Sequence, residues 1–236
     1  MTIADDHIAV ISPSATVTVL TGAGISVPSG LAPFRGPGGM WNDIDIETYV
    51  SATGFRRDRG KVVGFLRDML RQTRAAVPNE AHLALARAER ARSDGAQFHL
   101  ITQNIDGLHT RAGSKNVYEI HGSLEVDRCE RCGAKYPAES RNACTCSGRL
   151  RPDVVLFEES LPSDAMQKAA IALRTCEFFV TIGTSGVVWP AAGFLHEAKS
   201  CGARCYNINV EPSGQSAFDQ ELIGPAEELV AKLFGV

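Results

Sequence analysis

Residues 17–26 have the sequence VTVLTGAGIS, in which an apolar, β-branched run passes directly into a Gly-Ala-Gly turn. Dinucleotide-binding folds turn a buried strand into a phosphate-binding helix at such a junction. The glycines let the backbone approach a pyrophosphate, and the helix N-terminus supplies free N–H donors. Val27 occupies the position of the last glycine in GxGxxG, and the acidic residue about 20 positions further on is missing. Two interpretations stay open: a cofactor held in another way, and a turn that binds nothing.

Three similar runs follow along the chain: Phe98 to Thr102, Phe178 to Gly183 and Arg204 to Val210. Each is apolar on both faces and leads into small or polar residues and then helix-like sequence. This pattern predicts a parallel sheet covered by helices on both sides. The predicted fold class is α/β, a doubly wound Rossmann-like sheet.

Two stretches between the first two runs have helical periodicity, at 61–74 and 79–92. The second is expected to bury Leu83, Leu85 and Ala86. Residues 28–45 are rich in Gly and Pro, so we expect a functional loop there without regular structure.

Four of the seven cysteines, Cys129, Cys132, Cys144 and Cys146, crowd into eighteen residues. Two close pairs separated by a short loop can place four thiolates around one tetrahedral Zn²⁺, with no position left for water or substrate. We therefore predict a structural zinc site, with unliganded thiols as the alternative. The remaining cysteines, Cys176, Cys201 and Cys205, stand in or beside apolar segments and are expected to be buried thiols.

The cysteine-bearing residues 127–151 interrupt the α/β rhythm. They suggest a small zinc-binding module inserted into a Rossmann-like cofactor domain made of residues 1–126 and 152–236. A further helical and loop part is expected around residues 34–78.

The composition indicates a compact chain with a full core, since 44% of its 236 residues are hydrophobic. The 24 Lys and Arg and 27 Asp and Glu form no block of like charge, which argues against a dedicated nucleic-acid or anionic-membrane surface. No apolar run approaches the roughly 20 residues of a membrane helix. The acidic N-terminus resembles neither a signal nor a transit peptide. We expect a cytoplasmic location.

Polar segments follow the strands at Thr102 to His109 and at Gly183 to Gly186, and His121-Gly122 precedes the cysteine module. The carboxyl ends of parallel strands line the crevice where such sheets bind ligands. Taken singly, each segment is equally compatible with loop capping, and a lone His is more often structural than catalytic.

Together these motifs resemble the sirtuin family. The resemblance rests on Gly22-Ala23-Gly24-Ile25-Ser26, Ser29-Gly30, Phe34-Arg35, Gln103-Asn104-Ile105-Asp106, His121-Gly122, the four cysteines, Gly183-Thr184-Ser185 and Asn209. It extends from about Val17 to Val230. It implies an NAD-dependent protein-lysine deacylase that releases nicotinamide and O-acyl-ADP-ribose, with NAD⁺ as co-substrate and one structural Zn²⁺.

The resemblance also implies roles for single residues. His121 would deprotonate a ribose hydroxyl, while Asn104 and Asp106 would orient the nicotinamide amide and the ribose. The implied cofactor residues are Gly22, Ala23, Gly24, Ile25, Ser26, Phe34, Arg35, Gln103, Asn104, Ile105, Asp106, His121, Gly183, Thr184, Ser185, Asn209, Val210, Glu211 and Ala226. The acyl-lysine peptide would bind as an added strand beside Val187 and Val188, with Phe157 lining the lysine tunnel.

Two departures concern the substrate. The chain resembles the bacterial and mitochondrial branch that often removes succinyl and malonyl groups, but Leu66 and Met69 stand where that branch has a Tyr-x-x-Arg pair. An acidic acyl group would lose its bidentate partner, so we expect acetyl or longer neutral groups to be preferred. Alternatively, both side chains only face the core, and Arg67 or Arg71 reaches the acyl group. Glu158 replaces the glycine of the family's Phe-Gly-Glu, a change that concerns which peptides fit.

Two other functions stay open. An ADP-ribosyltransferase or NAD hydrolase on the same fold would use the same cofactor residues and pass the ribose to another acceptor. A non-catalytic NAD-sensing or zinc-ribbon module is the alternative outside enzymes. The presence of His121, Asn104 and Asp106 favours deacylation over both.

Overall fold

The computed structural model describes residues 8–34, 38–40, 44–185 and 191–236. Its centre is a six-stranded parallel sheet in the order β3-β2-β1-β7-β8-β9. The strands are β1 (Val17–Thr21), β2 (Phe98–Thr102), β3 (Val117–Glu119), β7 (Phe178–Ile182), β8 (Arg204–Asn209) and β9 (Gln220–Ile223). This order is that of a doubly wound dinucleotide-binding sheet, so the predicted fold class is confirmed.

The first two predicted strands match β1 and β2 in both bounds, and the other two end one residue early. Gly183 leaves β7 because its φ is +59°, in the left-handed region. Val210 leaves β8 because its N–H bonds to Oδ1 of Asn209 at 2.9 Å.

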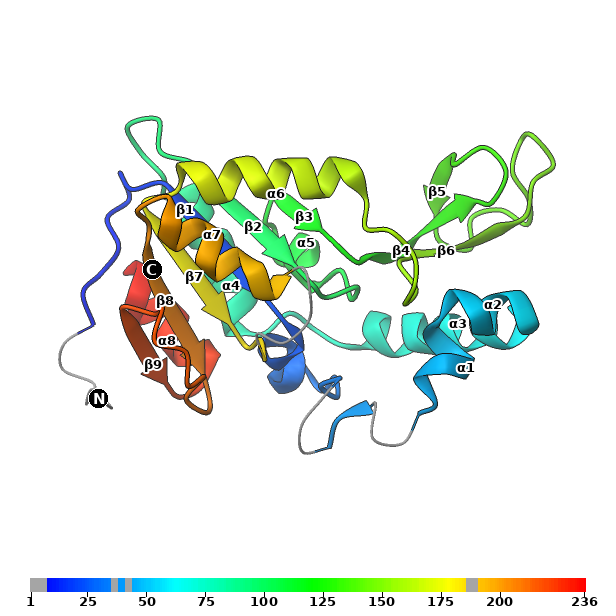
Figure 1. Ribbon diagram of the computed structural model, residues 1–236, viewed down its shortest axis with the longest axis horizontal. Coiled ribbons are helices and arrows are strands. Elements are labelled where there is room, and N and C mark those ends of the chain that lie inside the picture. The colour runs from blue at the N-terminus through cyan, green and yellow to red at the C-terminus, as the bar shows by residue number, and fades with distance from the viewer. Residues whose placement is uncertain (1–7, 35–37, 41–43, 186–190) are drawn as a thin grey trace.

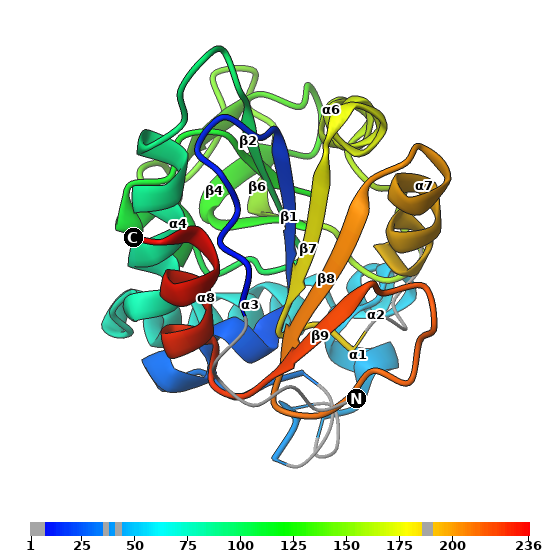
Figure 2. The ribbon, with the colours of Figure 1, turned by 90° about the vertical axis from the view of Figure 1, so that its left-hand side faces the viewer.

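Helices cover both faces of this sheet (Figure 2). On one face α4 (Glu80–Arg90) and α8 (Ala226–Phe234) pack their apolar residues against the strands. On the other face α6 (Ser163–Thr175) and α7 (Phe194–Ser200) do the same. Both strand faces are therefore buried, which explains the apolar runs in the sequence.

Helix α4 begins where Asn79 accepts a hydrogen bond from Ala81 N at 3.0 Å, a side-chain N-cap. Leu85 and Ala86 are fully buried as predicted, but Leu83 is 39% exposed. The expectation for Leu83 was wrong, because residues two apart in a helix point about 200° apart around its axis.

Two further predictions from sequence are corrected. Pro28 lies inside η2 (Ala23–Ser29), a 3-10 helix, so the irregular segment begins only after Ser29. Cys176 and Cys205 are buried, but Cys201 is exposed, because it stands at the C-terminal cap of α7 ahead of a turn at Gly202.

A second, three-stranded antiparallel sheet stands at one end of the molecule beside three helices (Figure 1). Its strands are β4 (Gly122–Cys129), β5 (Lys135–Pro137) and β6 (Leu150–Val154), and the helices are α1 (Ile46–Val50), α2 (Ala52–Arg57) and α3 (Arg59–Ala75). The first and last residues of the proposed module, 127 and 151, thus lie within strands β4 and β6.

Arginines of α3 tie this helix to the second sheet and its turn. Arg67 bonds to the buried carboxylate of Asp127 at 2.6 and 2.7 Å, and Arg74 pairs with Glu125 at 2.9 Å. Near the helix start, Arg59 pairs with Glu130 at 2.7 Å. Helix α3, which also borders the pocket described below, is therefore fixed relative to β4.

The described residues also form α5 (Leu108–Ala112) and η4 (Ala191–Gly193). None of the helices in the described ranges has the length and apolar character that a membrane span requires.

Candidate active site

The ends of four neighbouring strands lie at one level of the sheet. In the strand register Thr21 pairs with both Thr102 and Ile182, and Ile182 pairs with Ile208. The segments that follow these residues therefore leave the sheet side by side. They are the segments that carry most of the predicted cofactor residues.

Hydrogen bonds join these segments to one another. The Gly24 N–H donates to the Gly183 carbonyl at 2.9 Å, and the Gln103 side-chain amide donates to Oγ1 of Thr184 at 3.0 Å. The Asn209 side-chain amide donates to the Thr184 carbonyl at 3.2 Å. The structure thus brings together predicted residues from all four segments.

The glycines after β1 are needed for this packing. A Cβ atom at Gly22 would stand 2.8 Å from the Gly183 carbonyl oxygen, and one at Gly24 would stand 2.8 Å from the Gly183 Cα. Because backbone atoms cannot yield, either substitution would push the two loops apart. The glycines are thus required for the packing of the two loops, apart from any role in letting a phosphate group come close to the backbone.

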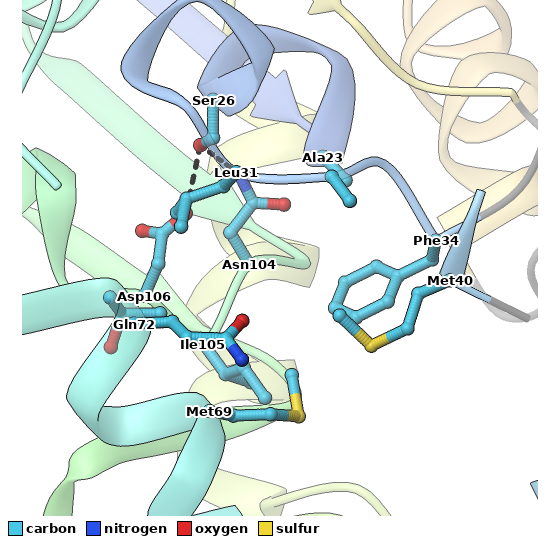
Figure 3. Close-up of a pocket in the computed structure, with 12 residues that line it drawn as sticks. Ala23, Ser26, Leu31, Phe34, Met40, Met69, Gln72, Asn104, Ile105 and Asp106 are labelled. Carbon is cyan, nitrogen blue, oxygen red and sulfur yellow. Dashed lines mark hydrogen bonds between the residues drawn. The ribbon is translucent and has the colours of Figure 1, made fainter. Parts of the chain in front are cut away.

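Beneath these loops lies a pocket lined by polar residues on one side and apolar residues on the other (Figure 3). Ser26 joins its polar wall: the Ser26 hydroxyl donates to Oδ2 of Asp106 at 2.8 Å, and Nδ2 of Asn104 lies 3.2 Å from the same hydroxyl. All three side chains are buried. The pocket lining is Ala23, Ser26, Leu31, Ala32, Phe34, Met40, Met69, Gln72, Thr73, Asn104, Ile105 and Asp106.

Hydrogen bonds hold both Asn104 and Asp106 in place, and Asn104 keeps one polar atom for a ligand. The Asn104 amide donates to the Gly22 carbonyl at 3.1 Å, while its Oδ1 atom is buried without a partner among the described residues. Such an oxygen is costly unless a ligand or water donates to it. Burial raises the pKa of Asp106, against the lowering effect of bonds from Leu108 N and Ser26.

His121 stands in the chain between β3 and β4, and its ring contacts the backbone of Gln103. Its Nδ1 lies 3.0 Å from the Gln103 carbonyl oxygen, an acceptor, so Nδ1 carries the proton and Nε2 the lone pair. Burial lowers the pKa of His121, and the Gln103 bond opposes this shift. The ring is therefore neutral at pH 7 and can accept a proton at Nε2.

Two residues next to His121 in the chain have unusual surroundings. Gly122 has φ +78°, and a Cβ atom there would stand 1.9 Å from the Asp153 carbonyl oxygen. Glu119, two residues before His121, is a titratable group that the sequence did not single out. Burial raises the pKa of Glu119 to about 7, and the charge of Asp106 adds to this shift.

The remaining predicted cofactor residues lie toward the outer strands. Ser185 and Glu211 are exposed, and Val210 is 71% exposed. Ala226 begins α8 just after β9, whose Ile223 pairs with Asn209. Arg35, Val187 and Val188 lie outside the described residues.

The two residues predicted for the acyl group differ in position. Both are buried members of one apolar cluster, Leu66 at 1% and Met69 at 6% exposed, but only Met69 also lines the pocket. Sequence reasoning missed Gln72, which also lines the pocket. Its position three residues after Met69, on the same face of α3, was the available signal.

Phe157 follows β6 and is 41% exposed, so it is not a core residue. Its N–H donates to the Val50 carbonyl and its carbonyl accepts from Ala52 N, each at 2.9 Å. Its backbone thus pairs with the junction of α1 and α2, in a parallel bridge opposite Ser51.

The four clustered cysteines fit one metal ion. Their sulfur atoms all lie within 4.8 Å of one another, and the Cys129–Cys146 and Cys132–Cys144 pairs are 3.6 and 3.5 Å apart. These separations are much longer than the S–S bond of a disulfide. They are close to the distance of about 3.8 Å that is expected between two sulfur ligands of a tetrahedral zinc ion. The site can hold one zinc through Cys129, Cys132, Cys144 and Cys146.

Comparisons with known proteins agree with this site. The family model described as "Sir2 family" matches residues 22–190. An NAD-dependent protein deacylase of Salmonella typhimurium is 43% identical over 225 residues, covering 91% of this chain and 81% of its own. An NAD-dependent protein deacylase of Thermus thermophilus is 43% identical over 203 residues, covering 84% of this chain and 80% of its own.

Solved structures show the same similarity. A mutant Sir2 homologue with ADP-ribose has a TM-score of 0.87 at 35% identity, covering 94% of this chain and 92% of that one. A Sir2 homologue with NAD has a TM-score of 0.84 at 36% identity, covering 94% and 90%. A Sir2 protein with a deacetylated p53 peptide and 3′-O-acetyl ADP-ribose has a TM-score of 0.81 at 31% identity, covering 93% and 92%.

Proposed function

The chain belongs to the Sir2 family and is an NAD-dependent protein deacylase, and we propose that it acts on acyl-lysine through His121 as general base. The observation that carries the proposal is the Nδ1 bond to the Gln103 carbonyl, which leaves the basic Nε2 atom of a neutral ring for the substrate. The bound NAD supplies an electrophilic ribose carbon and nicotinamide as the leaving group. The acyl-lysine would supply its acyl oxygen as the nucleophile, and binding, orientation and proton abstraction come from the chain itself.

The pocket beneath the β1 and β2 loops suits the nicotinamide end of NAD. Oδ1 of Asn104, which has no partner in the part of the chain that the structure describes, is an acceptor for a carboxamide N–H, and Asp106 lies beside it. Phe34 and Met40 form an apolar side that fits an aromatic ring and excludes water. We assign orientation of the nicotinamide and ribose to Asn104 and Asp106.

The loops above the pocket suit the remainder of the dinucleotide. Gly22, Ala23 and Gly24 lead into η2, and the N–H groups of both glycines already donate to the carbonyls of Ile182 and Gly183. What favours a pyrophosphate here is that glycines let a ligand come close to the backbone. Thr184, Ser185 and Asn209 stand at the ends of the next strands toward the sheet edge. We place the adenosine ribose near Asn209, with the adenine toward Glu211 and Ala226.

We propose that the peptide binds as an added strand with its lysine passing Phe157. Main-chain pairing gives such an arrangement affinity with modest sequence preference. The exposed ring of Phe157, held by backbone bonds on both sides, supports this placement. Neutral acyl groups are the preferred class, because Met69 presents a thioether to the pocket, Arg67 is engaged by Asp127 and Arg71 by Asp68.

A direct assay tests the function. The purified protein is incubated with NAD and an acetyl-lysine peptide, and free lysine peptide, nicotinamide and O-acetyl-ADP-ribose are quantified by mass spectrometry. Equal amounts of the three products support deacylation. Nicotinamide without deacylated peptide would instead indicate an NAD hydrolase, and ADP-ribose attached to protein would indicate a transferase.

The cellular setting is a separate proposal. Four closely spaced thiols that can serve as zinc ligands suit a reducing compartment. On this ground we propose that the protein works in the cytoplasm.

A further inference from the structure

Glu158 has a backbone conformation that side chains rarely adopt. Its φ is +74°, in the left-handed region that favours glycine. A residue held there against its intrinsic preference needs compensating contacts from its surroundings. Glu158 has such contacts, and those within the described residues come from one helix, α2.

The carboxylate of Glu158 caps helix α2. Its Oε2 accepts from Thr53 N at 3.0 Å and from the Thr53 hydroxyl at 2.7 Å. Arg56 lies 3.9 Å from the same oxygen and also donates to the Thr53 hydroxyl at 2.8 Å. Hydrogen bonds from a backbone N–H at a helix start to a carboxylate are among the stronger ones in proteins.

The segment that Glu158 ends also touches His121. Val155 N donates to the His121 carbonyl at 2.9 Å, two residues before Phe157. Residues 155–158 thus run from the backbone of His121 to the first turn of α2. The exposed Phe157 ring lies between these two attachments.

We propose that Glu158 is a positioning residue for the acyl-lysine peptide. Its carboxylate holds residues 155–158 against α2 and so fixes Phe157 in the orientation that receives the lysine side chain. The inference rests on the proposed placement of the lysine beside Phe157. Because NAD binds at the loops after β1, β2, β7 and β8, loss of the anchor affects the peptide and leaves NAD binding unchanged.

Steady-state kinetics of Glu158→Gly and Glu158→Gln test this role. NAD is kept saturating while the concentration of an acetyl-lysine peptide is varied. Glycine removes the anchor and suits the left-handed backbone, so the variant folds. The variant loses both hydrogen bonds that Thr53 donates to the carboxylate. We expect its KM for peptide to rise at least about tenfold, the change that loss of even one hydrogen bond to a charged group produces. Glutamine keeps an oxygen acceptor for both Thr53 donors and holds KM for peptide within about threefold of the unmodified protein. KM for NAD stays the same in both.

Two further variants sharpen the test. Thr53→Val removes the hydroxyl from the other partner, so its effect and that of Glu158→Gly should be less than additive in the double variant. Glu139→Gly is the matched control, because Glu139 is also a glutamate with positive φ (+61°) whose carboxylate meets an arginine, in the cysteine-bearing sheet region. Its KM for peptide should not change.

An unchanged KM for peptide in Glu158→Gly, or an equal rise in KM for NAD, would overturn the inference, as would a Gln variant as impaired as the Gly variant. Failure of the proposed function has a different signature, since the unmodified protein would then release no lysine peptide at all.

Discussion

The Nδ1 atom of His121 lies 3.0 Å from the backbone carbonyl oxygen of Gln103, the residue that begins the loop after β2. The same Gln103 donates its side-chain amide to Thr184 on the loop after β7. One residue therefore fixes the tautomer of the proposed base and also joins two of the loops proposed to hold NAD. The catalytic and cofactor geometries are coupled through it.

His121→Ala is expected to abolish deacylation while the protein stays folded and still binds NAD. Alanine removes the proton acceptor, and general bases contribute about 10²- to 10⁴-fold in rate. Peptide turnover by mass spectrometry and NAD binding by calorimetry measure the two effects. Deacylation at the unmodified rate would remove His121 from the mechanism.

The pH profile of kcat/KM should show an acid limb below the ordinary histidine pKa of 6.5. His121 is active only when neutral, so activity falls as pH drops through its pKa, and burial lowers that pKa. Full activity is expected to persist at pH 7. Glu119→Gln is the control, because burial raises the pKa of Glu119 to about 7. If that substitution moves the limb, the limb belongs to Glu119 and the assignment to His121 is wrong.

Cys129→Ser should destabilise the fold. Apparent zinc contributions in small structural sites are about 10–16 kcal/mol, so losing one of four sulfur ligands removes a large part of the local stability. Thermal unfolding and zinc content by atomic emission check this. Cys201→Ser is the control, since Cys201 is exposed and distant in sequence from the cluster. Stable, metal-free protein with full activity would contradict a structural role for zinc.

The sequence was most informative where a local rule determines structure. The strand and glycine turn at residues 17–26 and the spacing of the four cysteines each depend on neighbours in the chain. The edge strands β3 and β9 are too short and too exposed to produce an apolar run. Likewise, Leu31 and Met40 line the same pocket as Met69 and Gln72 of α3, a tertiary arrangement without a local signal.

Stability should fall as the pH drops from about 6.5 to about 4, because His82 is buried without a partner for either ring nitrogen among the described residues. Burial lowers the pKa of His82 to about 4, with the charge of Arg111 adding to the shift. Between the two values the unfolded chain binds more protons than the folded one. The contribution is therefore fully present above pH 6.5 and declines by about 3 kcal/mol toward pH 4.

Urea unfolding of the unmodified protein and of His82→Leu between about pH 6.5 and pH 4 measures the contribution of His82 to the unfolding free energy. Leucine does not titrate, so the pH dependence of its unfolding free energy should be shallower. The neighbouring His109, whose pKa burial also lowers, adds to the slope in both proteins. Identical slopes in the two proteins would show that His82 does not contribute.

The preferred acyl group is the property in which we expect this chain to differ from the desuccinylating branch that it resembles. Met69 lines the pocket, so each extra methylene packed against it should contribute up to about 0.8 kcal/mol until the space is filled. Acetyl or longer neutral groups should therefore have higher kcat/KM than succinyl on the same peptide. Arg67 is not expected to rescue an acidic group, since it does not line the pocket and its Nη2 is held by the buried carboxylate of Asp127 at 2.6 Å. Its Nη1 is buried without a partner among the described residues.

Two variants test the pocket. Leu66→Tyr/Met69→Arg should gain succinyl turnover by adding a hydroxyl and a guanidinium, although Leu66 is fully buried and the tyrosine must displace neighbours in its cluster. Met69→Ala avoids that strain: it enlarges the pocket, so the optimum should shift to a longer neutral chain. The competing interpretation is that both residues serve only the core, and it predicts lower stability in Met69→Ala with an unaltered order of acyl groups. Equal or better succinyl turnover by the unmodified protein would refute the apolar pocket outright, because an apolar lining cannot replace the lost hydration of a carboxylate.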